Sequence, residues 1–182
     1  MTRSIVLVAG SPAAQSRSSA LLDAFGVALT ARGLRPIRYA LADFPLADLV
    51  HGSAENEPTR RFLSDVALAR GIVFSTPTYK ATYAGALKII IDLLAPSALE
   101  GKAALAITSA RLDPHLSEID DSFQRLYRFF KGSTGLVSLG VLDGQISYSP
   151  APGAQEGLRL ALDATAQRAF DAAVERFSAA AT

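Results

Sequence analysis

The sequence contains no cysteine. Disulfide bonds, thiolate catalysis and cysteine-ligated metals are therefore excluded, and the cysteine phosphatases with them. Histidine is also scarce, with two in the chain. No second histidine or carboxylate accompanies His51 at metal-ligand spacing, so we predict a solvent-exposed side chain there and no metal site.

An excess of one charge is missing as well. The formal net charge is +1 and 19% of the residues are charged, so we expect neither nucleic acid nor an anionic membrane as a partner. The N-terminal apolar run is too short for a secretory signal, and no segment is long enough to cross a bilayer. These absences predict a soluble, cytoplasmic protein.

Internal repeats, low-complexity tracts and convincing linkers are absent too. The 182 residues, of which 49% are hydrophobic, are enough for one well-buried core and too few for two ordinary domains. We therefore expect residues 1–182 to form a single domain.

Short apolar runs alternate with segments of helical periodicity along the whole chain. This alternation predicts a doubly wound α/β fold, with five parallel strands in the common order 2-1-3-4-5 and helices on both faces. The expected strands span residues 5–9, 35–39, 72–74, 103–108 and 135–141. The expected helices span residues 21–29, 59–70, 84–94, 113–130 and 158–177.

The segment Gly10–Ser19 lies between the first strand and the first helix and contains little that could pack in a core. Free backbone N–H groups, the positive end of a helix dipole and serine hydroxyls would meet there, which suits a phosphate. Helix capping alone needs only one such side chain. The segment matches neither a Walker loop nor the Gly-x-G-x-x-Gly dinucleotide motif. The candidate phosphate ligands are Ser11, Ser16, Arg17, Ser18 and Ser19.

The segment 75–83 forms a second candidate loop, after the third strand. Its tyrosines and polar residues suit a planar heteroaromatic ring with polar edges, and Gly85 would allow a close approach. Tyrosines packed over the sheet, beside a solvated Lys80, are an equal alternative on these residues alone. In the predicted sheet the first strand lies beside the third, so both loops flank the crevice where such sheets bind ligands.

Together the two motifs resemble the NADPH-dependent FMN reductase family. They read Gly-Ser-Pro-x-x-x-Ser-Arg-Ser-Ser at 10–19 and Thr-Pro-Thr-Tyr-Lys-x-x-Tyr-x-Gly-Ala-Leu-Lys at 76–88, followed by Asp-Leu-Leu at 92–94. The similarity covers nearly the whole chain and is greatest to the flavin reductases of two-component alkanesulfonate monooxygenase systems. It implies a flavodoxin-like fold, FMN as the flavin, NADPH or NADH as the donor, and a homodimer or homotetramer. It also implies that reduced flavin passes to a partner monooxygenase.

The resemblance also implies roles for individual residues. The serines and Arg17 of the first motif would hold the FMN phosphate. The second motif would line the ribityl chain and the isoalloxazine through Pro77, Thr78, Tyr79 and Lys80, with Tyr83 and Gly85 near the ring or across a subunit interface.

The chain departs from the family pattern in two places. Ser109-Ala110-Arg111 stands where the family usually has a Gly-Gly pair against the pyrimidine edge of the flavin, and Arg111 would add charge there. Asp121 occupies the position of a tyrosine that the sulfonate-system enzymes carry in a bulged helix at a tetramer interface.

Hydride transfer between stacked nicotinamide and flavin rings depends mainly on placement, so we expect no catalytic side chain beyond an electrostatic role for Lys80 or Arg111. The main alternative is a reductase of the same fold that retains FMN and reduces a quinone, an azo compound or a metal oxyanion. Electron carriers of this fold tend to be strongly acidic, unlike this chain. A phospho-receiver would need acidic residues where Ala9 and Gly10 stand.

Overall fold

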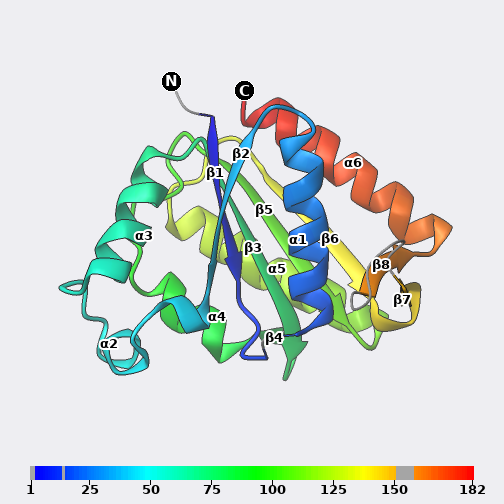
Figure 1. Cartoon of the computed structure of the whole chain (residues 1–182), viewed down its shortest axis with the longest axis horizontal. Helices are drawn as coiled ribbons and strands as arrows, with labels where there is room; N and C mark the ends of the chain where they lie inside the picture. Colours follow the sequence, from blue (N-terminus) through cyan, green and yellow to red (C-terminus); the bar gives the residue numbers. More distant parts are fainter. Residues whose placement is uncertain (1–2, 14, 151–157) are drawn as a thin grey trace.

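The computed structural model describes residues 3–13, 15–150 and 158–182. Its central sheet has five parallel strands in the order β2-β1-β3-β5-β6, which confirms the predicted flavodoxin-like arrangement (Figure 1). A short strand β4 (Thr82–Tyr83) pairs antiparallel with the end of β3. The parallel strands are β1 (Ser4–Ala9), β2 (Arg35–Ala40), β3 (Gly71–Tyr79), β5 (Ala103–Ala110) and β6 (Leu136–Leu142).

Helices cover both faces of this sheet, as predicted (Figure 1). One face is covered by α1 (Arg17–Thr30) and α6 (Ala164–Ala180), and the other by α3 (Glu57–Leu68), α4 (Gly85–Ile91) and α5 (Asp113–Phe129). The remaining elements are η1 (Leu41–Asp43), α2 (Leu46–His51), η2 (Asp143–Gln145), β7 (Ile146–Pro150) and β8 (Leu158–Leu162). No helix in the described ranges is long and apolar enough to cross a membrane.

The core consists of two layers, because every residue of β1 is buried and successive side chains point to opposite faces. Ile5 and Leu7 belong to the layer beneath α1 and α6, whereas Val6 and Val8 belong to the other. In the first layer, Phe25 of α1 makes edge-to-face contacts with two phenylalanines of α6, at centroid distances of 5.7 and 5.9 Å. This packing joins α1 to α6 over the same face of the sheet.

The prediction of one long helix over residues 158–177 is wrong at its beginning. Residues 158–162 form β8, which pairs antiparallel with β7. The helix α6 begins after Asp163, whose carboxylate accepts hydrogen bonds from the backbone N–H groups of Thr165 and Ala166 at 2.9 and 2.7 Å. Such an N-cap favours a helix start at this position, so the apolar residues before it were free to join a hairpin.

Two further boundaries differ from prediction. Residues 75–79, expected in a loop, continue β3, because their backbone pairs with β5 as far as Pro77 and then with β4. Residues 46–51, for which no element was predicted, form the short helix α2, which ends at Gly52 in the left-handed conformation (φ 65°).

Candidate functional site

The segments singled out from the sequence meet at one edge of the sheet. Ala9 of β1 pairs with Ser75 of β3, and Pro77 of β3 pairs with Ser109 of β5. Because all three strands run parallel, their carboxyl ends and the loops that follow lie side by side (Figure 1). This edge is the candidate site.

Serine hydroxyls converge at the beginning of α1. Ser16 is the N-cap, and its Oγ accepts a hydrogen bond from the backbone N–H of Ser19 at 3.1 Å. The same Oγ lies 2.9 Å from Ser19 Oγ and 3.2 Å from Ser18 Oγ. The first turn of a helix also has backbone N–H groups without intrahelical partners. Three of the five predicted phosphate ligands therefore surround a point of positive helix potential.

Two hydrogen bonds attach this first loop to the end of β3. The N–H of Gly10 donates to the carbonyl of Ser75 at 2.7 Å, and the buried Ser75 hydroxyl donates to the carbonyl of Ser18 at 2.7 Å. Ser75 thus connects the loop before α1 to α1 itself, and both to the strand that carries the second motif. The relative position of the two motifs is set by buried contacts.

The second motif ends in a strained hairpin turn. Tyr79 pairs with Thr82, and the two residues between them, Lys80 and Ala81, have φ angles of 52° and 63°. Two-residue hairpin loops favour this left-handed geometry, but side chains other than glycine or asparagine adopt it at a cost of about 1–3 kcal/mol each. Such strain is most common at ligand-binding positions.

Some side chains of this hairpin already have hydrogen-bond or packing partners within the chain, and others do not. The Thr76 hydroxyl donates to the Pro77 carbonyl and accepts from the N–H of Ala84, so it orients the start of α4. The Thr78 hydroxyl is buried and has no hydrogen-bond partner among the described residues. Tyr79 is half exposed. Tyr83 packs on Phe123 of α5 at a centroid distance of 5.3 Å, as in the packing alternative for the tyrosines.

The predicted cations and glycine lie at the surface of this edge. Arg17 is half exposed, and its Nη1 lies 3.6 Å from Oδ2 of Asp143, which follows β6. Lys80 and Arg111 are exposed, whereas Ser109 is buried. A Cβ at Gly85 would meet nothing within 4 Å. Among the described residues, therefore, no other part of the chain makes the close approach to Gly85 that the sequence predicts.

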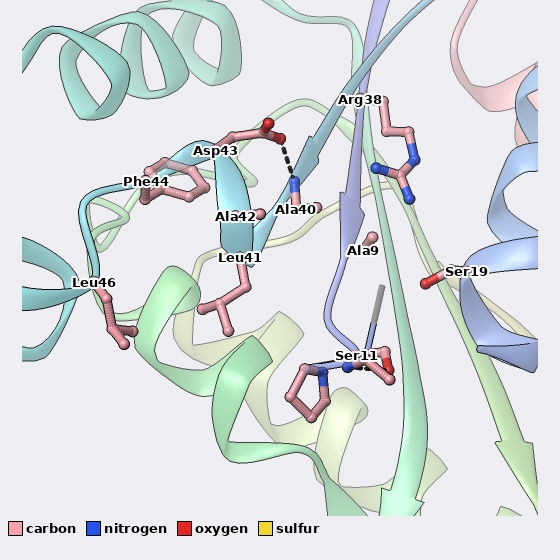
Figure 2. Close-up of a pocket in the computed structure, with 12 residues that line it drawn as sticks. Ala9, Ser11, Ser19, Arg38, Ala40, Leu41, Ala42, Asp43, Phe44 and Leu46 are labelled. Atoms are coloured by element: carbon pink, nitrogen blue, oxygen red, sulfur yellow. Dashed lines mark hydrogen bonds between the residues drawn. The ribbon is translucent and has the colours of Figure 1, made fainter. Parts of the chain in front are cut away.

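A pocket of about 410 Å³ opens on the other side of the first loop, towards β2 (Figure 2). No local sequence pattern marks this pocket, although the order 2-1-3 already implies that the end of β2 flanks the first loop. The loop and α1 contribute Ser11, Pro12, Ala13 and Ser19, and β1 contributes Ala9. The end of β2 and the residues after it contribute Arg38, Ala40, Leu41, Ala42, Asp43, Phe44 and Leu46.

Metal-binding chemistry has no support in the described part of the chain. No group of three or more histidine or carboxylate side chains gathers there. His51 is exposed at the end of α2, as predicted, and His115 lies half-buried in the first turn of α5.

Comparisons with known proteins agree on one family. Residues 3–132 match the model of the NADPH-dependent FMN reductase family. An FMN reductase (NADPH) of Pseudomonas putida strain KT2440 is 33% identical over 145 residues, which cover 80% of this chain and 74% of that protein. An FMN reductase (NADPH) of Escherichia coli K12 is 31% identical over 173 residues, covering 94% and 90%. The crystal structure of the NADH:FMN oxidoreductase EMOB in its apo form superimposes with a TM-score of 0.84 at 24% identity, covering 98% and 89%.

Proposed function

Because this chain belongs to the NADPH-dependent FMN reductase family, we propose that it is an NAD(P)H:FMN oxidoreductase that transfers a hydride from the reduced nicotinamide to FMN. The observation that carries the proposal is the convergence of Ser16, Ser18 and Ser19 at the start of α1, attached through Ser75 to the end of β3, where the second motif begins. A phosphate and a ring system can then be held at a defined separation.

The first loop supports binding of the flavin phosphate. Ser11, Ser16, Ser18 and Ser19 supply hydroxyl donors, and Arg17 supplies a positive charge at the same helix end. A dianionic phosphate gains from the helix dipole and from charge-assisted hydrogen bonds, which are about twice as strong as neutral ones. The buried attachment to β3 keeps these donors in place before the ligand arrives.

The hairpin after β3 supports binding of the ribityl chain and the ring. The unpartnered hydroxyl of Thr78 is a donor that a flavin could satisfy, and leaving it buried without a partner is costly. Pro77 and Tyr79, which precede and follow Thr78 in β3, offer apolar surface, and Tyr79 is open to solvent. Lys80 directly follows Tyr79 in the strained turn, and its side chain is exposed.

When bound, the flavin accepts the hydride, and its pyrimidine side becomes more negative. Lys80 and Arg111 are the cations nearest in sequence to the two strand ends that would line that side, and they would stabilise the added charge. The chain needs no proton donor for the transfer itself. Its contribution is to hold two planar rings in contact, and orientation of this kind accounts for much of the rate.

We further propose that the flavin leaves after reduction and passes to a monooxygenase, and that the protein works as a homodimer or homotetramer. Arg17, Tyr79 and Lys80, which would contact the flavin, are all open to solvent, which supports exchange of the ligand. Exposed apolar side chains at the same edge, Tyr79 and Leu112, would suit contact with another protein.

The decisive experiment measures NADPH oxidation without oxygen and without another acceptor, as free FMN is raised from zero. We expect sustained turnover that saturates with FMN. A single flavin reduction, resumed only when a quinone or an azo compound is added, would instead indicate a reductase that retains FMN. No oxidation of NADPH or NADH with any of these acceptors would contradict the proposed function.

The same assay tests the phosphate site through a matched pair of variants. Arg17→Ala removes the cation, whereas Asp143→Ala removes only its ion-pair partner. We expect Arg17→Ala to weaken FMN binding by about three- to tenfold, less than a buried charged contact because Arg17 is half exposed. Asp143→Ala should leave FMN binding unchanged or slightly tighter. Equal weakening in both variants would mean that Arg17 acts only through its ion pair.

A further inference from the structure

A second pocket, of about 510 Å³, lies beside α1 where α1, β8 and α6 contact one another (Figure 1). This volume is within the usual range of small-molecule sites. We name it the α1–β8 pocket. None of the described residues that line it belongs to the pocket beside the first loop or is proposed to bind the flavin. The proposed function therefore leaves this pocket unexplained.

Most of the surface of the α1–β8 pocket comes from apolar side chains. Ala20 and Ala24 lie one turn apart on α1, and their small side chains leave room for a ligand. Leu160 and Leu162 share one face of β8 and supply larger apolar surface. Both leucines are partly buried and pack against the core beneath α1 and α6. An apolar ligand group that covers this surface would be stabilised by its removal from water.

Two polar side chains, Asp23 of α1 and Gln167 of α6, also line the pocket. Oδ1 of Asp23 accepts from Arg38 Nε at 2.7 Å, and no described residue donates to its Oδ2. Gln167 donates through Nε2 to Asp171 at 2.9 Å, and no described residue donates to its Oε1. The pocket thus presents a carboxylate oxygen and an amide oxygen, which can only accept hydrogen bonds.

The charge of these groups selects between ligands. None of the described residues that line the α1–β8 pocket is basic, and Arg38, which pairs with Asp23, lines the other pocket. An anionic ligand would be repelled by the Asp23 carboxylate, and a neutral one would gain no charge-assisted hydrogen bond from it. A protonated primary amine brings three N–H donors and a positive charge. The polar end of a matching ligand is therefore an ammonium group.

We propose that the α1–β8 pocket binds apolar primary amines, with the ammonium group on Oδ2 of Asp23 and the apolar body on Leu160 and Leu162. The side chains of Arg38 and Asp23 are 40% and 55% exposed, so water screens the charge of the carboxylate. A ligand of about ten heavy atoms should therefore bind with a dissociation constant in the millimolar range. The inference does not rest on the proposed function, because the pocket and the flavin site share no residue.

The test titrates the isotope-labelled protein with phenethylamine and follows its amide chemical shifts without added nucleotide. Phenethyl alcohol, of nearly the same shape and without charge, is the matched ligand control. Asp23→Asn removes the charge, and its control Arg38→Gln breaks the same ion pair but keeps Asp23. Ala20→Phe fills the pocket, and its control Ala172→Phe lies on the exposed surface of α6. We expect Asp23→Asn to weaken the amine about three- to fivefold, Ala20→Phe to weaken it at least about fivefold, and both controls to bind it as the wild type does or more tightly.

The alcohol should bind the wild type about three- to fivefold more weakly than the amine and should bind Asp23→Asn and the wild type equally. Equal binding of amine and alcohol by the wild type would overturn the inference, as would equal weakening of the amine by Asp23→Asn and Arg38→Gln. Unchanged amide shifts at Ala24, Leu160 and Leu162 would also overturn it. Loss of amine binding as the protein dimerises at higher concentration would assign the pocket to contact between copies instead. None of these outcomes depends on flavin reduction, because no nucleotide is present.

Discussion

Replacing Gly10 with alanine tests whether the first loop is held rigidly against β3. Gly10 directly follows β1, and its N–H donates to the Ser75 carbonyl. An added Cβ would lie 2.5 Å from Leu87 Cβ and 2.8 Å from the Ser75 carbonyl oxygen. Both obstacles are rigid, because one is backbone and the other is the first carbon of a fully buried side chain.

The size of the effect follows from these two contacts. Against an ordinary contact of 3.4 Å, the methyl carbon is too close by about 0.9 Å to Leu87 and about 0.6 Å to Ser75, so the loop must move by a comparable amount. Overpacking of this kind typically costs about 1–3 kcal/mol, and we expect the upper half of that range. A displacement approaching 1 Å in the phosphate loop should also raise the KM for FMN by roughly 10- to 100-fold.

Urea unfolding and steady-state kinetics measure the two effects. A loss of 2–3 kcal/mol corresponds to a fall of about 1 M in the urea midpoint. Gly26→Ala is a control in which we expect a smaller loss of stability. Its Cβ would lie 2.9 Å from the flexible end of the Leu7 side chain, and alanine favours the helix more than glycine does. Gly144→Ala is a neutral control, since its Cβ would meet nothing within 4 Å. An unchanged midpoint and an unchanged KM in Gly10→Ala would refute the rigid attachment.

Two further predictions concern single hydroxyl groups. Thr78→Val removes an unpartnered hydroxyl, so it should leave the free energy of unfolding unchanged or higher and should weaken FMN binding. The control Thr59→Val removes a similar hydroxyl in α3 and should leave FMN binding unaffected. Equal FMN binding by the two variants would contradict the role of Thr78. Burial and the 2.6 Å hydrogen bond to Asp65 raise the pKa of Tyr39 above its ordinary value, so its stabilisation is present below pH ~10 and lost as pH rises further. The urea midpoint of Tyr39→Phe should therefore be lower than that of the wild type at pH 7, and the two midpoints should converge above pH ~11. A difference between the two midpoints that stays constant with pH would contradict this.

Much of the fold was predictable because its signals are local. The strands β1, β3 and β5 each contain a continuous apolar run, and the longer helices show apolar residues at 3.6-residue spacing. With the common strand order of doubly wound sheets, these patterns predict the order that the structure shows. The candidate phosphate loop has a local signal as well, since the serines that converge at the start of α1 lie within four consecutive positions.

Two of the errors occurred where the structure of a segment depends on the strand with which it pairs. The apolar residues Leu158 and Leu162 fit a helical spacing with the residues after them, but they also fit the alternation of a strand through Leu160. Pairing with β7 favours the strand, and the N-cap at Asp163 makes the helix begin only after that residue. The extension of β3 to Tyr79 similarly depends on β4 and β5, which no local pattern reveals.

Local sequence was thus sufficient for the fold class and for locating a candidate phosphate loop, because backbone propensity, burial pattern and helix capping act over a few neighbouring residues. The pocket beside that loop depended on the folded arrangement. Arg38 and Ser19 line one pocket only because β2 lies next to β1 and α1 packs across them. Arg38 is in turn held by Asp23, fifteen positions away. Contacts of this kind arise from packing between elements, so one-dimensional periodicity does not contain them.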